Sequence, residues 1–188
     1  MSIWILHQRM TEDEEAHIFE RKHLHLPFDG LPDLSQVSSP AQAMQLLRVL
    51  YPGEPPESLA RRRDRFWNLF SGIQVEDIIA VPLKASRQVV LAEVTGRYQY
   101  DVGDKGSDIH LIPVKWYESR IPMGKFSKHK EIFLAQGEAM VEVTAQEARI
   151  AIRDKLPHKY NRFARWKWLL MLFFLMNILA MLTQGTHW

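Results

Sequence analysis

Residues 66–116 constrain the fold more than any other stretch of the chain. A helix end at Phe66-Trp67 is followed by three apolar segments, 78–83, 89–100 and 109–117, which are separated by polar or glycine-bearing turns. Short apolar segments bounded by turns predict β-strands. Because aromatic and cationic side chains edge these strands, they indicate a small barrel that holds a flat, electron-rich ligand such as a nucleobase.

The flanking segments predict helices and further strands. Thr11 with Glu14 forms a capping box that predicts a helix to about His23, and Ser39-Pro40 begins a second helix. The other expected elements are a strand at 3–6, extended chain at 24–28, a helix at 58–70, a strand at 139–143 and a helix capped by Thr144 with Glu147 that stops before Pro157. This order predicts an α+β fold with helices early and a mostly antiparallel, barrel-like sheet after them.

The C-terminal segment predicts a membrane helix. From Trp168 to Leu182 only Asn177 is polar, and the longer stretch 166–188 reaches about 34 Å as a helix, enough to cross a hydrocarbon core of about 30 Å. Lys and Arg crowd the upstream flank and are absent downstream, which predicts a single span of the cytoplasmic membrane with the N-terminal domain in the cytoplasm. A helix lying on the bilayer surface, or one docked on this domain or a partner chain, is the alternative. The lone amide of Asn177 predicts a homo-oligomer formed through this helix.

The expected organisation is therefore a domain over 1–155, a basic linker over 156–165 and a transmembrane helix over 166–188. The chain has no cysteine, which excludes disulfides, cysteine nucleophiles and thiolate metal sites. It contains no nucleophile elbow, zinc-protease motif or phosphate-binding glycine loop. His23 and His25 lack a third ligand at a recognisable spacing, and the aspartates at 101–108 lie among glycines and serine, which favours a loop over a nuclease centre. We therefore expect no catalytic activity, no cofactor and no metal.

Several short motifs occur in the order found in one known domain. They are Trp4, Phe28 with the LPDLS stretch at 31–35, Tyr51-Pro52, Phe66-Trp67, the EDIIAVPLK stretch at 76–84, EVTGRYQY at 93–100 and PVKW at 113–116. Together they resemble the N-terminal domain that precedes the nuclease in Mrr-type restriction proteins. The chain departs from that pattern at Phe28, where the family has tryptophan, and at Glu76, where it has glycine.

The resemblance implies a PUA/EVE-like pseudo-barrel with flanking helices, which reads nucleic acid, including modified bases. The nucleobase pocket that it implies in this chain consists of Trp4, Phe28, Lys84, Tyr98, Tyr100 and Trp116. A base stacked on Trp or Tyr gains about 1–3 kcal/mol, although buried aromatic side chains also simply build small cores. Arg61, Arg62, Arg65 and Lys115 are the candidate phosphate contacts, with a solvated helix face as the alternative for the arginines.

These features predict a membrane-anchored binding module that is not an enzyme. Its expected partners are nucleic acid, DNA more than RNA, and the lipid bilayer. A nucleic-acid reader joined to a membrane helix in place of a nuclease fits a role in phage defence, with the helix as anchor or effector. The alternatives are a sensor of a small nucleotide signal and a tail-anchored adaptor that binds another protein.

Overall fold

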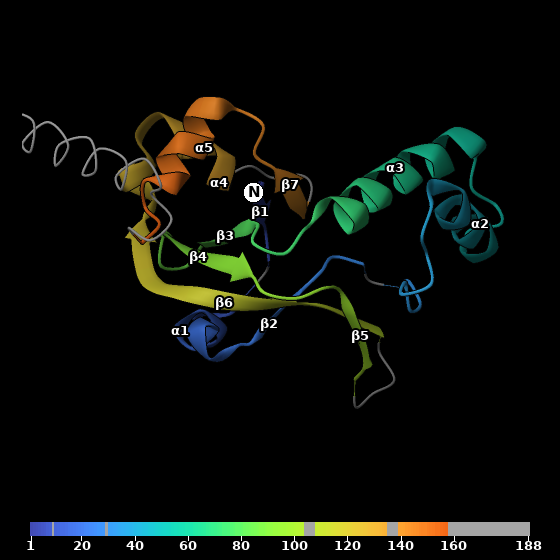
Figure 1. Ribbon diagram of the computed structural model, residues 1–188, viewed down its shortest axis with the longest axis horizontal. Helices are drawn as coiled ribbons and strands as arrows, with labels where there is room; N and C mark the ends of the chain where they lie inside the picture. The colour runs from blue at the N-terminus through green and yellow to red at the C-terminus, as the bar shows by residue number, and fades with distance from the viewer. Residues whose placement is uncertain (9, 29, 104–107, 135–138, 158–188) are drawn as a thin grey trace, which may run out of the picture.

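A mixed β-sheet forms the centre of the molecule (Figure 1). The structure is a computed structural model that describes residues 1–8, 10–28, 30–103, 108–134 and 139–157. Its strands are β1 (Ile3–Leu6), β2 (His23–His25), β3 (Ile78–Leu83), β4 (Gln88–Val94), β5 (Gln99–Val102), β6 (Asp108–Pro122) and β7 (Met140–Glu142). They follow the order β2-β6-β4-β3-β1-β7, with β5 also paired to β6. Only the β1–β3 pair among these strands is parallel.

The long strand β6 makes the sheet curl into a half-barrel. Residues 114–122 of β6 pair with β4, whereas residues 108–113 pair with β2 and β5. A register shift opposite Val89 and Leu91 marks a bulge in the β4–β6 ladder, and bulges bend a strand and increase its twist. The predicted α+β class with a barrel-like sheet is therefore confirmed.

Helices cover both faces of this sheet. They are α1 (Glu12–Ala16), the 3-10 turn η1 (Ile18–Glu20), α2 (Pro40–Leu50), α3 (Pro56–Gly72), the 3-10 segment η2 (Met123–His129), α4 (Glu131–Leu134) and α5 (Gln146–Arg153). In Figure 1, α4 and α5 lie on one side of the sheet and α1 on the other, while α2 and α3 form a hairpin beside it.

Alternation along the central strand explains the two cores. Ile79 and Val81 of β3 face the core that contains buried residues of α2 and α3, whereas Ile78 and Ala80 face the core formed with η2, α4 and α5. All six residues of β3 are buried. A strand covered on both faces is apolar throughout rather than alternating, which is why the 78–83 segment is so apolar.

Several predicted elements are confirmed, and three are wrong in detail. β1 and β3 have the predicted bounds, and the Thr11–Glu14 capping box is present. The first helix ends at Ala16 rather than near His23, because Arg120 takes the carbonyl oxygens of Glu15 and Ala16 at 2.6 and 2.9 Å.

The other two errors concern a strand and a cap. The predicted strand 89–100 is two strands, since the chain bends at Gly96, where a Cβ would lie 2.9 Å from the Pro113 ring. The last helix begins after Ala145 without a side-chain cap, so Thr144 is not its capping residue.

The predicted linker and membrane helix fall almost wholly outside the described residues, which end at residue 157. In the part of the chain that the structure describes, no helix is both long enough and apolar enough to cross a bilayer. Leu156, the first residue of the predicted linker, is buried in the core beside α5.

Candidate functional site

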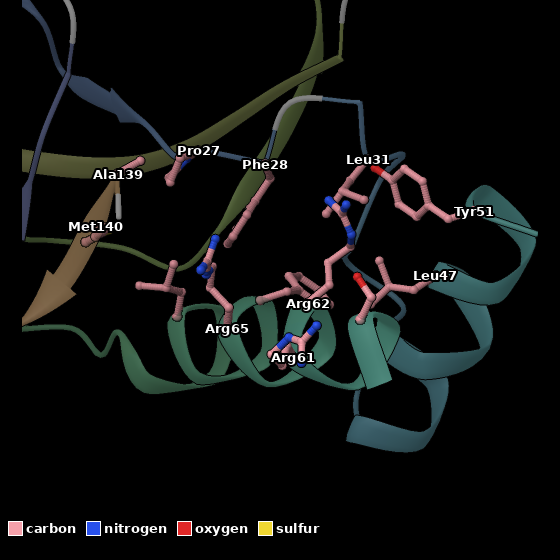
Figure 2. Close-up of a pocket in the computed structure, with 13 residues that line it drawn as sticks. Pro27, Phe28, Leu31, Leu47, Tyr51, Arg61, Arg62, Arg65, Ala139 and Met140 are labelled. Carbon is pink, nitrogen blue, oxygen red and sulfur yellow. The ribbon is translucent and has the colours of Figure 1, made fainter. Parts of the chain in front are cut away.

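A cavity of about 380 Å³ opens between the α2–α3 hairpin, the segment 27–31 and the beginning of β7 (Figure 2). We call it the arginine cavity, because Arg61, Arg62 and Arg65 of α3 line it. Its apolar wall includes Phe28 and Leu47. Ligand sites are typically concave and combine an apolar wall with placed polar groups. This cavity has both, and its exposed lining is more polar than that of a typical site.

Helical spacing brings the arginines to the same side of α3. The buried face of α3 carries Leu59, Phe66 and Leu69, and residues four apart lie above one another on a helix. Arg61 and Arg65 are therefore neighbours, and both are exposed. Figure 2 shows Arg62 and Arg65 extending from α3 toward the segment that carries Phe28 and Leu31.

Arg62 is held in place by a carboxylate and an aromatic ring. Its Nε and Nη2 donate to the two oxygens of Glu54 at 3.2 and 3.1 Å, and its guanidinium lies 4.4 Å from the centre of the Tyr51 ring. Ser58 also donates to Glu54, at 2.7 Å. Hydrogen bonds from Arg62 lower the pKa of Glu54, and the same contact raises the pKa of Arg62. Arg62 is thus fixed in orientation but partly neutralised.

The lining of the cavity contains three arginines and no acidic residue, which makes it electropositive. Arg61 has no ion pair with any residue that the structure describes. Like charges four residues apart cost an isolated helix about 0.2–0.5 kcal/mol, so the Arg61–Arg65 pair does not serve helix stability. Arg63, by contrast, points its charge to Asp64 at 2.5 Å and does not line the cavity. Guanidinium groups bind phosphate oxygens in a bidentate manner, and the arrangement is suited to an anion.

Phe28 is the one predicted pocket aromatic that borders this cavity. It is 4% exposed and packs edge-on against Phe66, with ring centres 5.4 Å apart. Phe28 therefore forms part of a wall rather than a free stacking surface. The structure brings Phe28 together with Arg61, Arg62 and Arg65, and it places the other six predicted residues elsewhere.

The two predicted pocket tryptophans are built into the core. Trp4 is 4% exposed, and its Nε1 donates to Asp77 at 3.2 Å. A Cβ added at Gly72 would lie 2.9 Å from the Trp4 ring, so α3 packs directly on it. Trp116 is 8% exposed and donates from Nε1 to the carbonyl oxygen of Arg21 at 2.6 Å. Trp4 thus donates to a buried carboxylate and Trp116 to a backbone carbonyl, and both rings are buried.

Tyr98 belongs to a network centred on His110, a residue that the sequence analysis missed. The backbone N–H of Leu34 donates to the Tyr98 hydroxyl at 3.2 Å, and that hydroxyl lies 2.8 Å from His110 Nδ1. His110 Nε2 lies 2.9 Å from the carbonyl oxygen of Leu31. Since a carbonyl only accepts, Nε2 carries the proton and Nδ1 accepts from Tyr98. Burial raises the pKa of Tyr98, and the network fastens the segment 31–34 to β6.

Tyr100 lies beyond this network, at the β5–β6 hairpin. Its hydroxyl donates to Asp108, and this hydrogen bond raises the pKa of Tyr100 to about 12. The ring centre of Tyr100 is 5.6 Å from that of His110. Tyr98 itself borders a separate cavity of about 490 Å³ with Phe70 and Arg97, so the two tyrosines do not reach the arginine cavity.

The predicted lysines lie on other surfaces. Lys84 is exposed at the turn between β3 and β4, where Glu15 accepts from the backbone N–H groups of Ala85 and Ser86 at 3.1 and 3.2 Å. Lys115 is exposed on β6, opposite Glu93 of β4. Neither lysine borders the arginine cavity.

Two features of the sequence indicate His110 and Glu54, which the sequence analysis did not assign to the site. His110 is a polar residue inside the apolar segment 109–117, and a buried polar residue in a strand needs partners. Glu54 lies two residues before α3, and its carboxylate reaches forward to Arg62, eight residues later in the chain. In the described part of the chain, no group of three or more His, Asp or Glu side chains is placed to hold a metal ion.

Comparison with known proteins identifies one family. Residues 4–135 match the family described as "Domain of unknown function (DUF8426)". That match spans more than half of the chain. It includes β1 from its second residue, the strands β2 to β6 and all three arginines of the cavity. No curated protein matches the chain. The chain belongs to the DUF8426 family.

Proposed function

We propose that this protein is a non-enzymatic sensor that binds nucleic acid through the arginine cavity and is anchored in the cytoplasmic membrane by residues 166–188. The observation that carries the proposal is the placing of Arg61, Arg62 and Arg65 around a single cavity with an apolar wall. Phosphate contacts by arginine supply most of the sequence-independent affinity for nucleic acid. The curled half-barrel supports the finer proposal of a PUA/EVE-like reader domain of the kind found in Mrr-type restriction proteins.

The division of labour within the cavity follows from its contacts. Arg61 and Arg65 supply exposed guanidinium groups, and Arg62 supplies a guanidinium already oriented by Glu54 and Tyr51. Recognition by a pre-oriented group loses less conformational entropy on binding. A reader of this kind, joined to a membrane helix as anchor or effector, is our proposal for a role in phage defence.

The test is binding of full-length protein in detergent to a fluorescent DNA duplex, measured by anisotropy over a range of salt concentrations. We expect Arg61→Ala/Arg65→Ala to weaken binding at least tenfold. Each lost phosphate contact lowers the salt slope by about 0.9, so the slope of log K against log salt falls by about 1.8. Arg48→Gln, an exposed arginine of α2 outside the cavity, is the matched control and keeps both values. A double variant that binds like wild type contradicts the proposal.

A second candidate function is favoured by the size of the cavity. A volume of about 380 Å³ lies within the range of small-molecule sites, which suits a single free nucleotide. Competition separates the two functions: a mononucleotide that displaces labelled DNA at micromolar concentration, while DNA alone binds weakly, favours the nucleotide sensor.

The membrane anchor has its own test. Full-length protein is expected in the membrane fraction after an alkaline carbonate wash, and a chain lacking 166–188 is expected in the supernatant. Recovery of both chains in the supernatant contradicts the anchor and leaves the binding proposal intact.

A further inference from the structure

A second and larger cleft adjoins the arginine cavity. Its volume is about 840 Å³, and Pro27 and Ala139 border both spaces. The end of β1, the strand β2 and three residues of the β5–β6 hairpin, Asp101, Ile109 and Leu111, supply its walls. We call it the histidine cleft, because His7, His23 and His25 line it.

The side chains of β2 present two of the imidazoles together. Successive residues of a strand point to opposite faces, and Leu24, between His23 and His25, is buried. His23 and His25 therefore share the face opposite Leu24. Gln8 donates from Nε2 to the carbonyl oxygen of His25 at 2.8 Å, which ties the chain after β1 to β2 across the cleft.

The charges of the histidine cleft are balanced, unlike those of the arginine cavity. Arg21 pairs with Glu14 at 3.0 Å, and the lining also contains one further base, Lys22, and one further acid, Asp101. The rest of the lining is imidazole, the amide of Gln8, or apolar, including Leu26 and Leu111. This composition does not favour phosphate. It favours a flat, uncharged polar group, which imidazoles contact by stacking and by hydrogen bonds to its edges.

His7 adds unused hydrogen-bonding capacity to the wall of this cleft. Its Nδ1 is buried and has no hydrogen-bond partner among the described residues. Burial, and secondarily the charge of Lys84, lower the pKa of His7, so its ring is neutral at neutral pH. A neutral imidazole adds no charge to the cleft, and the part of the His7 ring that lines the wall offers a flat polar surface beside His23 and His25.

We propose that a single-stranded segment of nucleic acid crosses both spaces, with its phosphates at Arg61 and Arg65 and a base in the histidine cleft. This inference rests on the proposed nucleic-acid function and specifies its ligand. A duplex keeps its bases stacked and paired inside, whereas an unpaired strand offers base faces and edges to concave protein surfaces. The shared border at Pro27 and Ala139 makes the two spaces neighbours along one strand.

The experiment compares oligothymidylates of two, four and eight nucleotides with a blunt duplex of eight base pairs, all fluorescein-labelled, using full-length protein in detergent. We expect the four- and eight-nucleotide strands to bind at least tenfold more tightly than the dinucleotide and than the duplex. His23→Ala/His25→Ala is expected to abolish this gain with length and to leave dinucleotide binding unchanged. Arg61→Ala/Arg65→Ala is expected to weaken binding of strands of every length. The control Arg48→Gln is expected to leave binding of every strand unchanged.

The outcomes separate this inference from the proposed function. Arginine-dependent binding without a gain from length, or tighter binding of the duplex than of the single strands, overturns the inference and leaves the proposed function standing. Equal binding by wild type and the histidine variant also overturns it. His23→Gln/His25→Gln, which keeps polar side chains on β2, repeats the test with the same expected result if the first variant melts at a lower temperature. Absence of binding to all probes overturns both proposals.

Discussion

Asp77 offers the sharpest test of how this fold is held together, because one buried carboxylate joins the first residues of the chain to the turn that precedes β3. Asp77 is 3% exposed and immediately precedes β3. Its Oδ1 accepts from the backbone N–H of Ser2 at 2.5 Å, and its Oδ2 accepts from Trp4 Nε1 at 3.2 Å and from the backbone N–H of Gln74 at 3.0 Å. The substitution Asp77→Asn keeps the size of the side chain and removes its charge.

The cost of this substitution follows from the geometry. The best orientation of the amide keeps its oxygen toward Trp4 and Gln74 and turns its NH2 group toward the N–H of Ser2. One hydrogen bond to a charged group, worth about 1.5–3 kcal/mol, is then lost, and the two that remain weaken toward neutral values near 1 kcal/mol. We therefore expect Asp77→Asn to lower the free energy of unfolding by about 3 kcal/mol.

Urea unfolding of the protein in detergent, followed by circular dichroism, measures this change. The exposed Asp64→Asn is the matched control and is expected to change the free energy of unfolding by less than about 0.5 kcal/mol. Trp4→Phe removes one donor, and its effect combined with Asp77→Asn is expected to be less than additive, since the two side chains share a hydrogen bond. A loss below about 0.5 kcal/mol for Asp77→Asn refutes this reasoning.

Three further predictions concern single contacts. Tyr98→Phe strips partners from the Leu34 N–H and His110 Nδ1, so the free energy of unfolding falls by about 2–3 kcal/mol in urea titrations; an unchanged midpoint contradicts the network. Glu76 adopts a left-handed φ of 73°, so Glu76→Gly raises the free energy of unfolding by about 0.5–1 kcal/mol, and a decrease contradicts the conformation. Lys84→Gln removes a like charge near His7, so the pKa of His7, followed by NMR, rises but stays below its ordinary value because burial is the larger cause; no rise contradicts the proximity of the two side chains.

Much of the framework could be predicted from local patterns. The segment 78–83 is apolar throughout and bounded by turn residues, and the structure confirms it as the doubly covered strand β3. Ser39 caps α2 and Pro40 begins it, as the motif predicts. These elements are set by interactions within a few residues of chain, which a sequence displays directly.

The errors arise where contacts between segments distant in sequence determine the ends of a helix or strand. Nothing in the residues near Ala16 ends a helix there, because the group that takes its last carbonyls, Arg120, lies on β6. The bend at Gly96 depends on the Pro113 ring of the neighbouring strand. Glu76 adopts a left-handed backbone conformation that ordinarily favours glycine, and nothing in its residue type indicates this.

The candidate site was predictable for its charges and not for its aromatic residues. A run of arginines on a helix is expected at the protein surface. The sequence does not show which other segment faces these arginines across the cavity. An aromatic side chain can pack in a core or stack against a ligand, and its residue type does not distinguish the two roles. Trp4 and Trp116 find hydrogen-bond partners at Asp77 and at the Arg21 carbonyl, and those partners are 73 and 95 residues away in sequence.

The position of both cavities follows from the incomplete closure of the sheet. The strand order ends at β2 on one side and β7 on the other; Pro27 closely follows β2, and Ala139 immediately precedes β7. Proline has no N–H to donate to a strand ladder, so the chain after β2 does not extend that edge at Pro27. The two spaces thus meet where the edges of the half-barrel approach without pairing, and α3 brings its arginines to one side of this opening. In our proposal the ligand occupies this open side of the half-barrel, where a closed barrel would pair its own strands.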